Sequence, residues 1–426
     1  MDDDLLASIE FRELVRRADR GVVLKRELDS ACIPAGRSVD EIWDALTDLR
    51  KSFAYYGPIL EYLPEGIGRN WHTVPASLRA SLQELSKRTQ KGSQLDTIAA
   101  ERKGARFMTQ FYIEEAVANL SHDGFDTDYE SVRAVITGER PCIDDAERIA
   151  LNFHGIMRSL DRYEELPFDA GIILDFYDEL TCEIPPNRLD AAVARTVLAP
   201  HASPLEPERM REQAMSIVVA TGNDLMLEPT QDPIMVSMLV NCHFWRFAPM
   251  RSCNNLMGCI ASRFYLVKKG LPAFRFLPKT KILEEWRRGS RFGGVARYAF
   301  DEVGVLEGRD TDWTAYYDTF MAIMLHMLEQ MESALLGMKA ADELLIERIA
   351  AIPYLNLRQR AILRRAVLDP ETEFTIARHR QANGIVYSTA RSDFETLVEK
   401  GYLLRVSGSG ANTYLSVPNL RKLLAQ

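Results

Sequence analysis

The sequence predicts a mainly α-helical protein, and its clearest helical pattern begins at Asp232. Asp232 is a favourable N-cap, and Pro233 follows at the first helical position, where a missing N–H costs nothing. Apolar residues then recur at helical spacing until Gly270 and Pro272 supply a stop signal. These apolar residues are Leu256, Ile260, Phe264 and Val267. Two other stretches with amphipathic spacing, residues 146–160 and 170–181, indicate the same fold class.

The length of 426 residues predicts two or three domains, each with room for a sizeable core. We expect an N-terminal helical region over residues 1–95, a helical core over 96–345 and a C-terminal module over 346–426. Hydrophobic content of 46% and charged content of 27% are ordinary values for globular proteins.

Charge and targeting signals narrow the class of protein. The net charge of −9 argues against a chain coated for nucleic acid but permits one local basic face. The acidic start, MDDDLLASIEF, lacks the basic and apolar runs of a signal peptide, and no stretch approaches the roughly 18 apolar residues of a membrane span. Six cysteines without framework spacing predict reduced thiols. We therefore expect a cytoplasmic protein that does not contact a membrane.

The junction between the two helices of the central pattern reads APMRSCNNL over residues 248–256. This helix–loop–helix frame resembles the Fic/Doc family, whose members mostly transfer AMP or related groups onto protein hydroxyls. The family signature is H-P-F-x-D/E-G-N-G-R-x-x-R at the start of the second helix. Pro249 and Asn254 match it, and Met250 is an apolar substitute for its Phe. The resemblance therefore indicates a degenerate Fic domain.

The other signature positions lack the groups that the chemistry needs. Ala248 stands where the signature has its general base, and Ser252 stands where it has the magnesium ligand. Cys253 and Asn255 replace the two glycines that let phosphates approach, and Leu256 and Cys259 replace the two arginines that bind them. We therefore expect no catalytic residue, no metal site and no cofactor.

The resemblance also implies an inhibitory motif, S/T-x-x-x-E-G/N, ahead of the core. The matching positions hold Asn119, Asp123 and Gly124. In the family the Glu of this motif pairs with the second signature arginine, which here is Cys259, so both halves of the switch are altered. A helix C-terminus with a glycine stop explains the same residues equally well.

Three further features are interpreted from the same frame. The resemblance implies a β-hairpin flap over residues 184–200. In active relatives this flap docks a target peptide through edge-strand pairing. His243 lies five residues before the lost base, rotated by roughly 140° around its helix, and is expected to pack between helices. The cysteines at 242, 253 and 259 match no zinc spacing and are expected to be small core residues.

Helical patterns recur in residues 353–426, which resemble bacterial winged helix-turn-helix domains. Asn356 caps a first helix, Thr375 begins a second that ends near Gly384, and a third ends at Gly401. On the third helix, the residues expected to face inward are Ala390, Phe394 and Leu397. Strands over 402–405 and 412–415 would form a hairpin, with Ser407-Gly408-Ser409-Gly410 as the wing.

The charge of this module is compatible with DNA. Residues 353–426 carry a net charge of +5 and the rest of the chain −14, the asymmetry expected if only the C-terminal module meets DNA. The resemblance implies base contacts from the third helix and phosphate contacts from the second helix and the wing. The residues concerned are Ser388, Thr389, Arg391, Ser392, Arg378, Arg380 and Arg405. The alternative is a module that packs on the core or mediates dimerisation.

The sequence thus predicts a catalytically inactive Fic-like protein that acts as a DNA-binding regulator or adaptor. DNA is the expected partner of the C-terminal module, and the core would serve as a platform for a protein partner or a second copy of the chain. The alternative function is a Fic-fold transferase with altered chemistry that uses another nucleotide-linked donor. A nucleotide or phosphate in the cleft would favour the enzyme, and a continuous basic face would favour the regulator.

Overall fold

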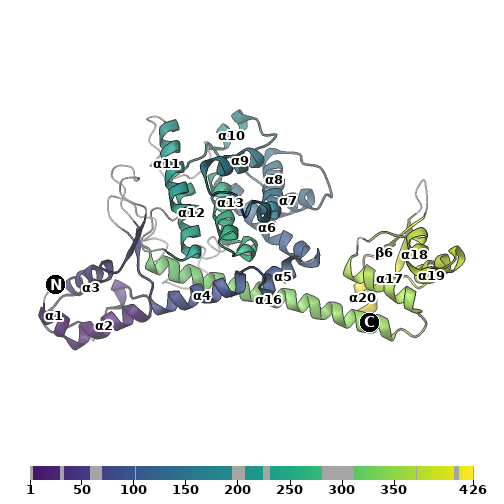
Figure 1. Ribbon diagram of the computed structural model, residues 1–426, viewed down its shortest axis with the longest axis horizontal. Helices are drawn as coiled ribbons and strands as arrows, with labels where there is room; N and C mark the ends of the chain where they lie inside the picture. The colour runs from purple at the N-terminus through teal and green to yellow at the C-terminus, as the bar shows by residue number, and fades with distance from the viewer. Residues whose placement is uncertain are drawn as a thin grey trace. The chain divides into compact units, whose positions relative to one another are not determined.

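The computed structural model describes residues 3–28, 33–57, 70–100, 102–193, 207–223, 231–280, 311–370, 372–406 and 412–425. This part of the chain is mainly α-helical, which confirms the predicted fold class (Figure 1). The chain forms two compact units. The first contains Met1–Ala100 and Ala105–Glu329, and the second contains Glu101–Gly104 and Gln330–Gln426.

Helices supply most of the structure before the second unit. In chain order they are α1 (Asp3–Ala7), α2 (Ile9–Arg20), α3 (Val39–Lys51), α4 (Ala76–Thr89), α5 (Gln94–Ala100), α6 (Arg102–His122), α7 (Tyr129–Ile136), α8 (Asp145–Ser159), α9 (Ala170–Leu180), α10 (Pro186–Val193), α11 (Pro207–Gly222), α12 (Pro233–Phe247) and α13 (Asn254–Lys268). Short 3-10 turns are η1 (Lys25–Glu27), η3 (Leu160–Tyr163) and η4 (Pro272–Phe276). Helix α16 (Thr314–Ala351) begins in the first unit and continues into the second. The sequence-based boundary after residue 345 lies within this helix.

The first unit also contains a small three-stranded sheet. Strand β1 (Tyr55–Gly57) pairs antiparallel with β2 (Asn70–His72), and β2 pairs in parallel with β3 (Thr311–Asp312). Two of these strands lie within residues 1–95, the predicted N-terminal helical region, and no strand was predicted there. The strands are three residues or shorter and depend on a partner far along the chain, which local periodicity does not report.

The centre of the first unit is the α12–α13 pair. The carboxylate of Asp232 accepts the N–H of Ile234 at 2.8 Å and caps α12, with Pro233 at its first position. Helix α13 packs against α12, α8, α9 and η4 and is buried on nearly all sides. The four apolar residues predicted to face the core of this helix are at most 2% exposed. Gly270 follows α13 with a φ of +78°, as expected of a helix stop.

The predicted flap is replaced by a helix in its described part. Residues Pro186–Val193 form α10, whereas residues 194–200 lie outside the described residues. Leu189 and Ala192, one helical turn apart, are 5% and 0% exposed, so burial of this apolar face favours a helix over an edge strand. Pro186 is compatible with the helix because it stands in the first turn.

The second unit combines short helices with a sheet after α16. Its elements are α17 (Leu357–Leu368), β4 (Phe374–Thr375), α18 (Ile376–Asn383), α19 (Tyr387–Glu399), β5 (Leu403–Val406), β6 (Thr413–Ser416) and α20 (Leu420–Ala425). The three strands are antiparallel in the order β4-β6-β5. The predicted helix caps Asn356 and Thr375 and the left-handed Gly384 lie at the expected ends. The predicted wing tip, residues 407–410, lies outside the described residues.

Phe394 is the centre of the second unit's core. Its ring is fully buried and stacks on Tyr414 of β6, with ring centroids 4.4 Å apart. Ala390 and Leu397, on the same face of α19, are also fully buried. The burial of this face confirms the predicted inward side of the third helix.

None of the helices in the described ranges is long and apolar enough to cross a membrane.

The α12–α13 contact depends on a glycine. A Cβ on Gly258 would lie 2.9 Å from Cβ of Phe244 and 3.0 Å from the carbonyl oxygen of Asn241, both on α12. We expect Gly258→Ala to lower the free energy of unfolding by about 1–3 kcal/mol, because the helices must separate. Gly155 on α8 has no atom within 4 Å of the same position, so Gly155→Ala should raise that free energy by about 0.5–1 kcal/mol. Denaturant unfolding measures both, and equal effects of the two variants would contradict this close approach.

Candidate functional site

The loop between α12 and α13 contains the residues that the sequence analysis compared with the Fic signature, and a left-handed residue stands at each of its ends. Ala248 ends α12 with φ 48°, and its N–H donates to the carbonyl oxygen of Phe244 at 3.0 Å. Cys253 precedes α13 with φ 56°. Non-glycine residues in this region are strained, and such strain collects at functional sites. Cys253 therefore has a backbone conformation that is usual for glycine.

Side chains fix this loop from three directions. Asn254 accepts the N–H of Met250 at 2.9 Å and donates to its carbonyl oxygen at 3.0 Å, so this asparagine closes the loop on itself. The hydroxyl of Ser252 lies 2.8 Å from that of Tyr177 on α9. Arg251 forms two hydrogen bonds, of 2.6 and 2.7 Å, with Asp190 on α10. The loop is therefore held in one conformation.

Asp123 occupies the amino end of α13. Its carboxylate accepts the backbone N–H groups of Asn255 and Leu256, both at 3.0 Å, and the side-chain amide of Asn255 at 2.9 Å. The residue is 1% exposed. Backbone N–H groups at a helix N-terminus are the groups that bind phosphates and other anions. Here the chain's own carboxylate takes that position.

Burial raises the pKa of Asp123 from 3.8 to about 6, and the hydrogen bonds from Asn255 and Leu256 oppose the shift only in part. Gly124 follows with a φ of +82°, the left-handed conformation of a glycine that terminates a helix, here α6. Among the described residues Asp123 forms its hydrogen bonds with Asn255 and Leu256, and Cys259 bonds to another acid. The expected alteration of both halves of the inhibitory motif stays a prediction.

The partner of Cys259 is Glu115, two turns before Asp123 on α6. The Cys259 thiol donates to the Glu115 carboxylate at 3.2 Å, and Arg263 donates to the same oxygen at 2.9 Å. Both members of the Glu115–Arg263 ion pair are almost fully buried. Asn119, midway between the two acids, lies 3.1 Å from the hydroxyl of Thr280. Glu115 and Asn119 of α6, and Asp123 just beyond its end, thus follow one another at intervals of four residues, and the two acids contact α13.

Lys279 borders this network. Its ammonium group donates to the hydroxyl of Ser262 at 2.7 Å, and the residue is 4% exposed. Burial and the nearby Arg263 lower the pKa of Lys279 to about 7, against the opposing effect of Glu115. Sequence reasoning missed Glu115, Arg263 and Lys279. Only the spacing of four residues between Glu115, Asn119 and Asp123 could have indicated that one helical face carries all three.

His243 lies on α12 away from the loop's polar contacts. It is fully buried, its Nδ1 is 3.3 Å from the hydroxyl of Thr221, and burial lowers its pKa to about 3. The prediction of a histidine that packs between helices is confirmed. Cys242, Cys253 and Cys259 are each at most 3% exposed and free of disulfides, as predicted for small core residues.

In the second unit, the residues predicted to contact DNA lie mostly on exposed surface. Ser388, Arg391 and Ser392 are exposed on α19, and Thr389 is partly buried. Arg380 on α18 and Arg405 on β5 are also exposed. Arg391 is not free, since it forms an ion pair with Glu395 at 2.6 Å. The i,i+4 spacing of these two residues could have predicted the pair.

Arg378 on α18 is exposed as well, and it lines a pocket together with residues of α17. Asp393 of α19 joins α18 and α19 to α17, and it is 2% exposed. Its carboxylate accepts from Arg358 and Asn356, each at 2.8 Å, and lies 3.0 Å from Nε2 of His379. One buried acid on α19 therefore fixes α17 and α18.

Comparisons with known proteins give one structural likeness to report. No protein-family model and no curated protein matches the chain. The crystal structure of a Fic family protein from Desulfovibrio desulfuricans G20 is similar over 81% of this chain and 97% of that one, with 14% identity and a TM-score of 0.45.

The position of Asp123 predicts a pH-dependent stability. Its pKa in the folded protein, about 6, exceeds its ordinary 3.8, so between these values the folded state holds more protons than the unfolded state. The free energy of unfolding should therefore fall by up to about 3 kcal/mol as pH rises from 4 to 6, and this loss should be absent in Asp123→Asn. Denaturant unfolding across this pH range measures the difference.

Asp126→Asn is the matched control, because Asp126 follows in the same segment and is exposed. Its stability should follow the wild-type pH dependence. Identical pH slopes for the wild type and Asp123→Asn would show that the buried carboxyl does not titrate in this window.

Proposed function

We propose that this protein is a DNA-binding regulator or adaptor whose first unit is a Fic-like domain without AMP-transfer chemistry. The observation that carries the proposal is the second unit's arrangement of α17, β4, α18, α19 and the β5–β6 hairpin, which is the order of elements in a winged helix-turn-helix domain. In such domains the third helix enters the major groove. The corresponding helix here is α19.

The exposed face of α19 supports this role. Its inner face is occupied by Phe394 and its neighbours, which leaves Ser388, Arg391 and Ser392 exposed on the first turns. Hydroxyl and guanidinium groups at these positions suit base edges and phosphates. Arg380 and Arg405 are the proposed phosphate contacts from α18 and β5. The net charge of +5 over residues 353–426, on a chain of −9 overall, favours contact through this unit.

The loss of chemistry in the first unit is supported by the loop geometry. Ala248 offers no group that can accept a proton, and Leu256 and Cys259 offer no cation for phosphates. The N–H groups at the amino end of α13 already bind Asp123. A nucleotide phosphate at that end would have to displace a buried carboxylate of the same sign of charge. This arrangement disfavours a transferase that uses a nucleotide-linked donor there.

The first test concerns nucleotide chemistry. We expect no transfer of label from α-labelled ATP to the protein itself or to lysate proteins, and no rescue by Ala248→His, since base, metal and phosphate groups act as a unit. Calorimetry should give a Kd for magnesium–ATP weaker than about 1 mM, because several charged hydrogen bonds worth about 1.5–3 kcal/mol each are missing. Labelled protein, or micromolar ATP binding, would mean that the loop retains a working nucleotide site.

The second test concerns DNA. Full-length protein should retard genomic fragments at low salt, and the affinity should fall with a log–log slope of roughly −0.9 per neutralised phosphate. On a selected fragment, Arg391→Ala should weaken binding by about 1–3 kcal/mol. Glu395→Gln should act in the opposite direction, because it frees Arg391 and removes a negative charge from the same face. Retardation of no fragment, or equal effects of both variants, would refute contact through α19.

A further inference from the structure

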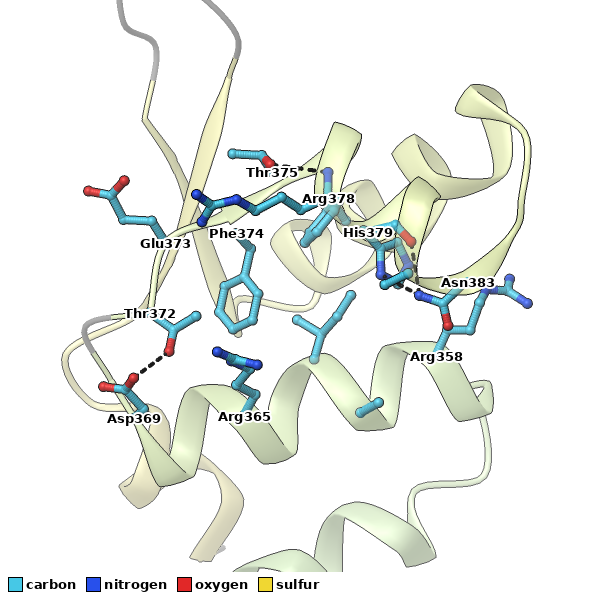
Figure 2. Close-up of a pocket in the computed structure, with 14 residues that line it drawn as sticks. Arg358, Arg365, Asp369, Thr372, Glu373, Phe374, Thr375, Arg378, His379 and Asn383 are labelled. Carbon is cyan, nitrogen blue, oxygen red and sulfur yellow. Dashed lines mark hydrogen bonds between the residues drawn. The ribbon is translucent and has the colours of Figure 1, made fainter. Parts of the chain in front are cut away.

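A pocket lies between α17, β4 and α18 of the second unit (Figure 2). Its volume is about 460 Å³, which is within the range of small-molecule sites. The proposed DNA contacts on α19 and β5 do not line it. The pocket therefore needs its own explanation.

One part of the lining is apolar. Phe374 extends from β4 into the pocket, and Ile362 of α17 and Phe394 of α19 also line it. Ile362 and Phe394 belong to the hydrophobic core, with Phe374 partly buried against it. A wall of this kind favours a ligand with an apolar body, and the Phe374 ring offers a face for stacking.

Two guanidinium groups line the same pocket from facing helices. Figure 2 shows Arg365 rising from α17 toward the Phe374 ring and Arg378 extending from α18 above that ring. Among the described residues, neither side chain forms a hydrogen bond or an ion pair with another. Guanidinium groups bind carboxylates through strong charge-assisted hydrogen bonds. Two of them at one apolar ring point to an anionic ligand.

The opposite end of the pocket is held rigidly. The carboxylate of Asp393 binds Arg358 and His379 from behind, and the amide of Asn383 lies 3.1 Å from Nδ1 of His379. These contacts position both lining side chains before a ligand arrives. A preorganised site loses less conformational entropy on binding.

Two acids limit the charge of the ligand. Asp369 and Glu373 also line the pocket, and Asp369 accepts the hydroxyl of Thr372 at 2.8 Å. With Asp393 behind Arg358, these carboxylates balance the charges of the three lining arginines. The pocket therefore has no excess positive charge to offset a polyphosphate, whereas Arg365 and Arg378 suffice for one carboxylate between them.

We propose that this pocket binds a small organic anion that carries one carboxylate on an aromatic or similarly apolar body. The carboxylate binds Arg365 and Arg378, and the body packs against Phe374 and Ile362. The ligand would bridge α17 to α18. This inference does not depend on DNA binding, and it is tested without DNA.

Calorimetry on the full-length protein tests the ligand class with three probes. Naphthalene-2-carboxylate should bind saturably at one site, with a Kd of about 0.1–1 mM for a ligand of this size. Naphthalene-2-carboxamide, which has the same shape without the charge, and pyrophosphate, which has the charge without the apolar body, should not bind measurably. Equal binding of the carboxylate and the carboxamide would overturn the proposal, as would the absence of carboxylate binding or stronger binding of pyrophosphate.

Matched arginine variants test the location. Arg365→Gln and Arg378→Gln should each weaken carboxylate binding about tenfold or more, because each removes a charged hydrogen bond. Arg364→Gln on α17 and Arg380→Gln on α18 are controls, since both residues are exposed and neither lines the pocket. Circular dichroism checks that all four variants fold. If the control variants weaken binding as much as the pocket variants, the anion binds to general surface charge and the assignment is wrong.

Discussion

The carboxylate of Asp123 is the contact on which the arrangement of the first unit's loop depends. It gives buried N–H groups at the start of α13 an acceptor that no neighbouring backbone supplies. It also joins the end of α6 to the start of α13, which places the polar residues of α6 opposite their partners on α13. Glu115 then reaches Cys259 and Arg263 from the same face of α6. Without this register, a buried ion pair and a buried acid would lose their partners together.

A second buried acid organises the other unit in a different electrostatic setting. Burial alone would raise the pKa of Asp393, but hydrogen bonds from Arg358, His379 and Asn356 lower it. Asp123 has only uncharged donors, so burial prevails and its pKa rises. Burial thus favours the protonated, neutral form of Asp123, whereas Asp393 is a stable anion because Arg358 is its cationic partner. Both acids join helices through directional hydrogen bonds, which fix the position of one helix along another more specifically than apolar contacts do.

Much of the fold could be predicted from the sequence because its helix ends are local. Asp232, Asn356 and Thr375 cap helices through atoms two or three residues away, and the glycine stops act within one turn. The errors concern contacts between distant segments. The β1–β2–β3 sheet joins residues near 70 to residues near 311, and α10 replaces a strand where Leu189 and Ala192 are buried.

The same limit applies to the candidate sites. The signature positions could be named from the sequence, but the occupant of the α13 N-terminus could not, since Asp123 is 132 residues away from Asn255. The pairing of Arg391 with Glu395 could be predicted from the sequence, because both residues lie on one helix. The Arg365–Arg378 pocket could not, because it forms only where α17 and α18 meet.

That separation of 132 residues also has a consequence for synthesis of the chain. At about 5–20 residues per second, the ribosome delivers α13 on the order of ten seconds after α6. During that interval the acids at 115 and 123 lack the partners that they have in the described structure, because those partners lie on α13 or beyond it. A nascent chain arrested between the two helices should therefore be a substrate for chaperones. Release of that interaction would mark the moment at which α13 docks.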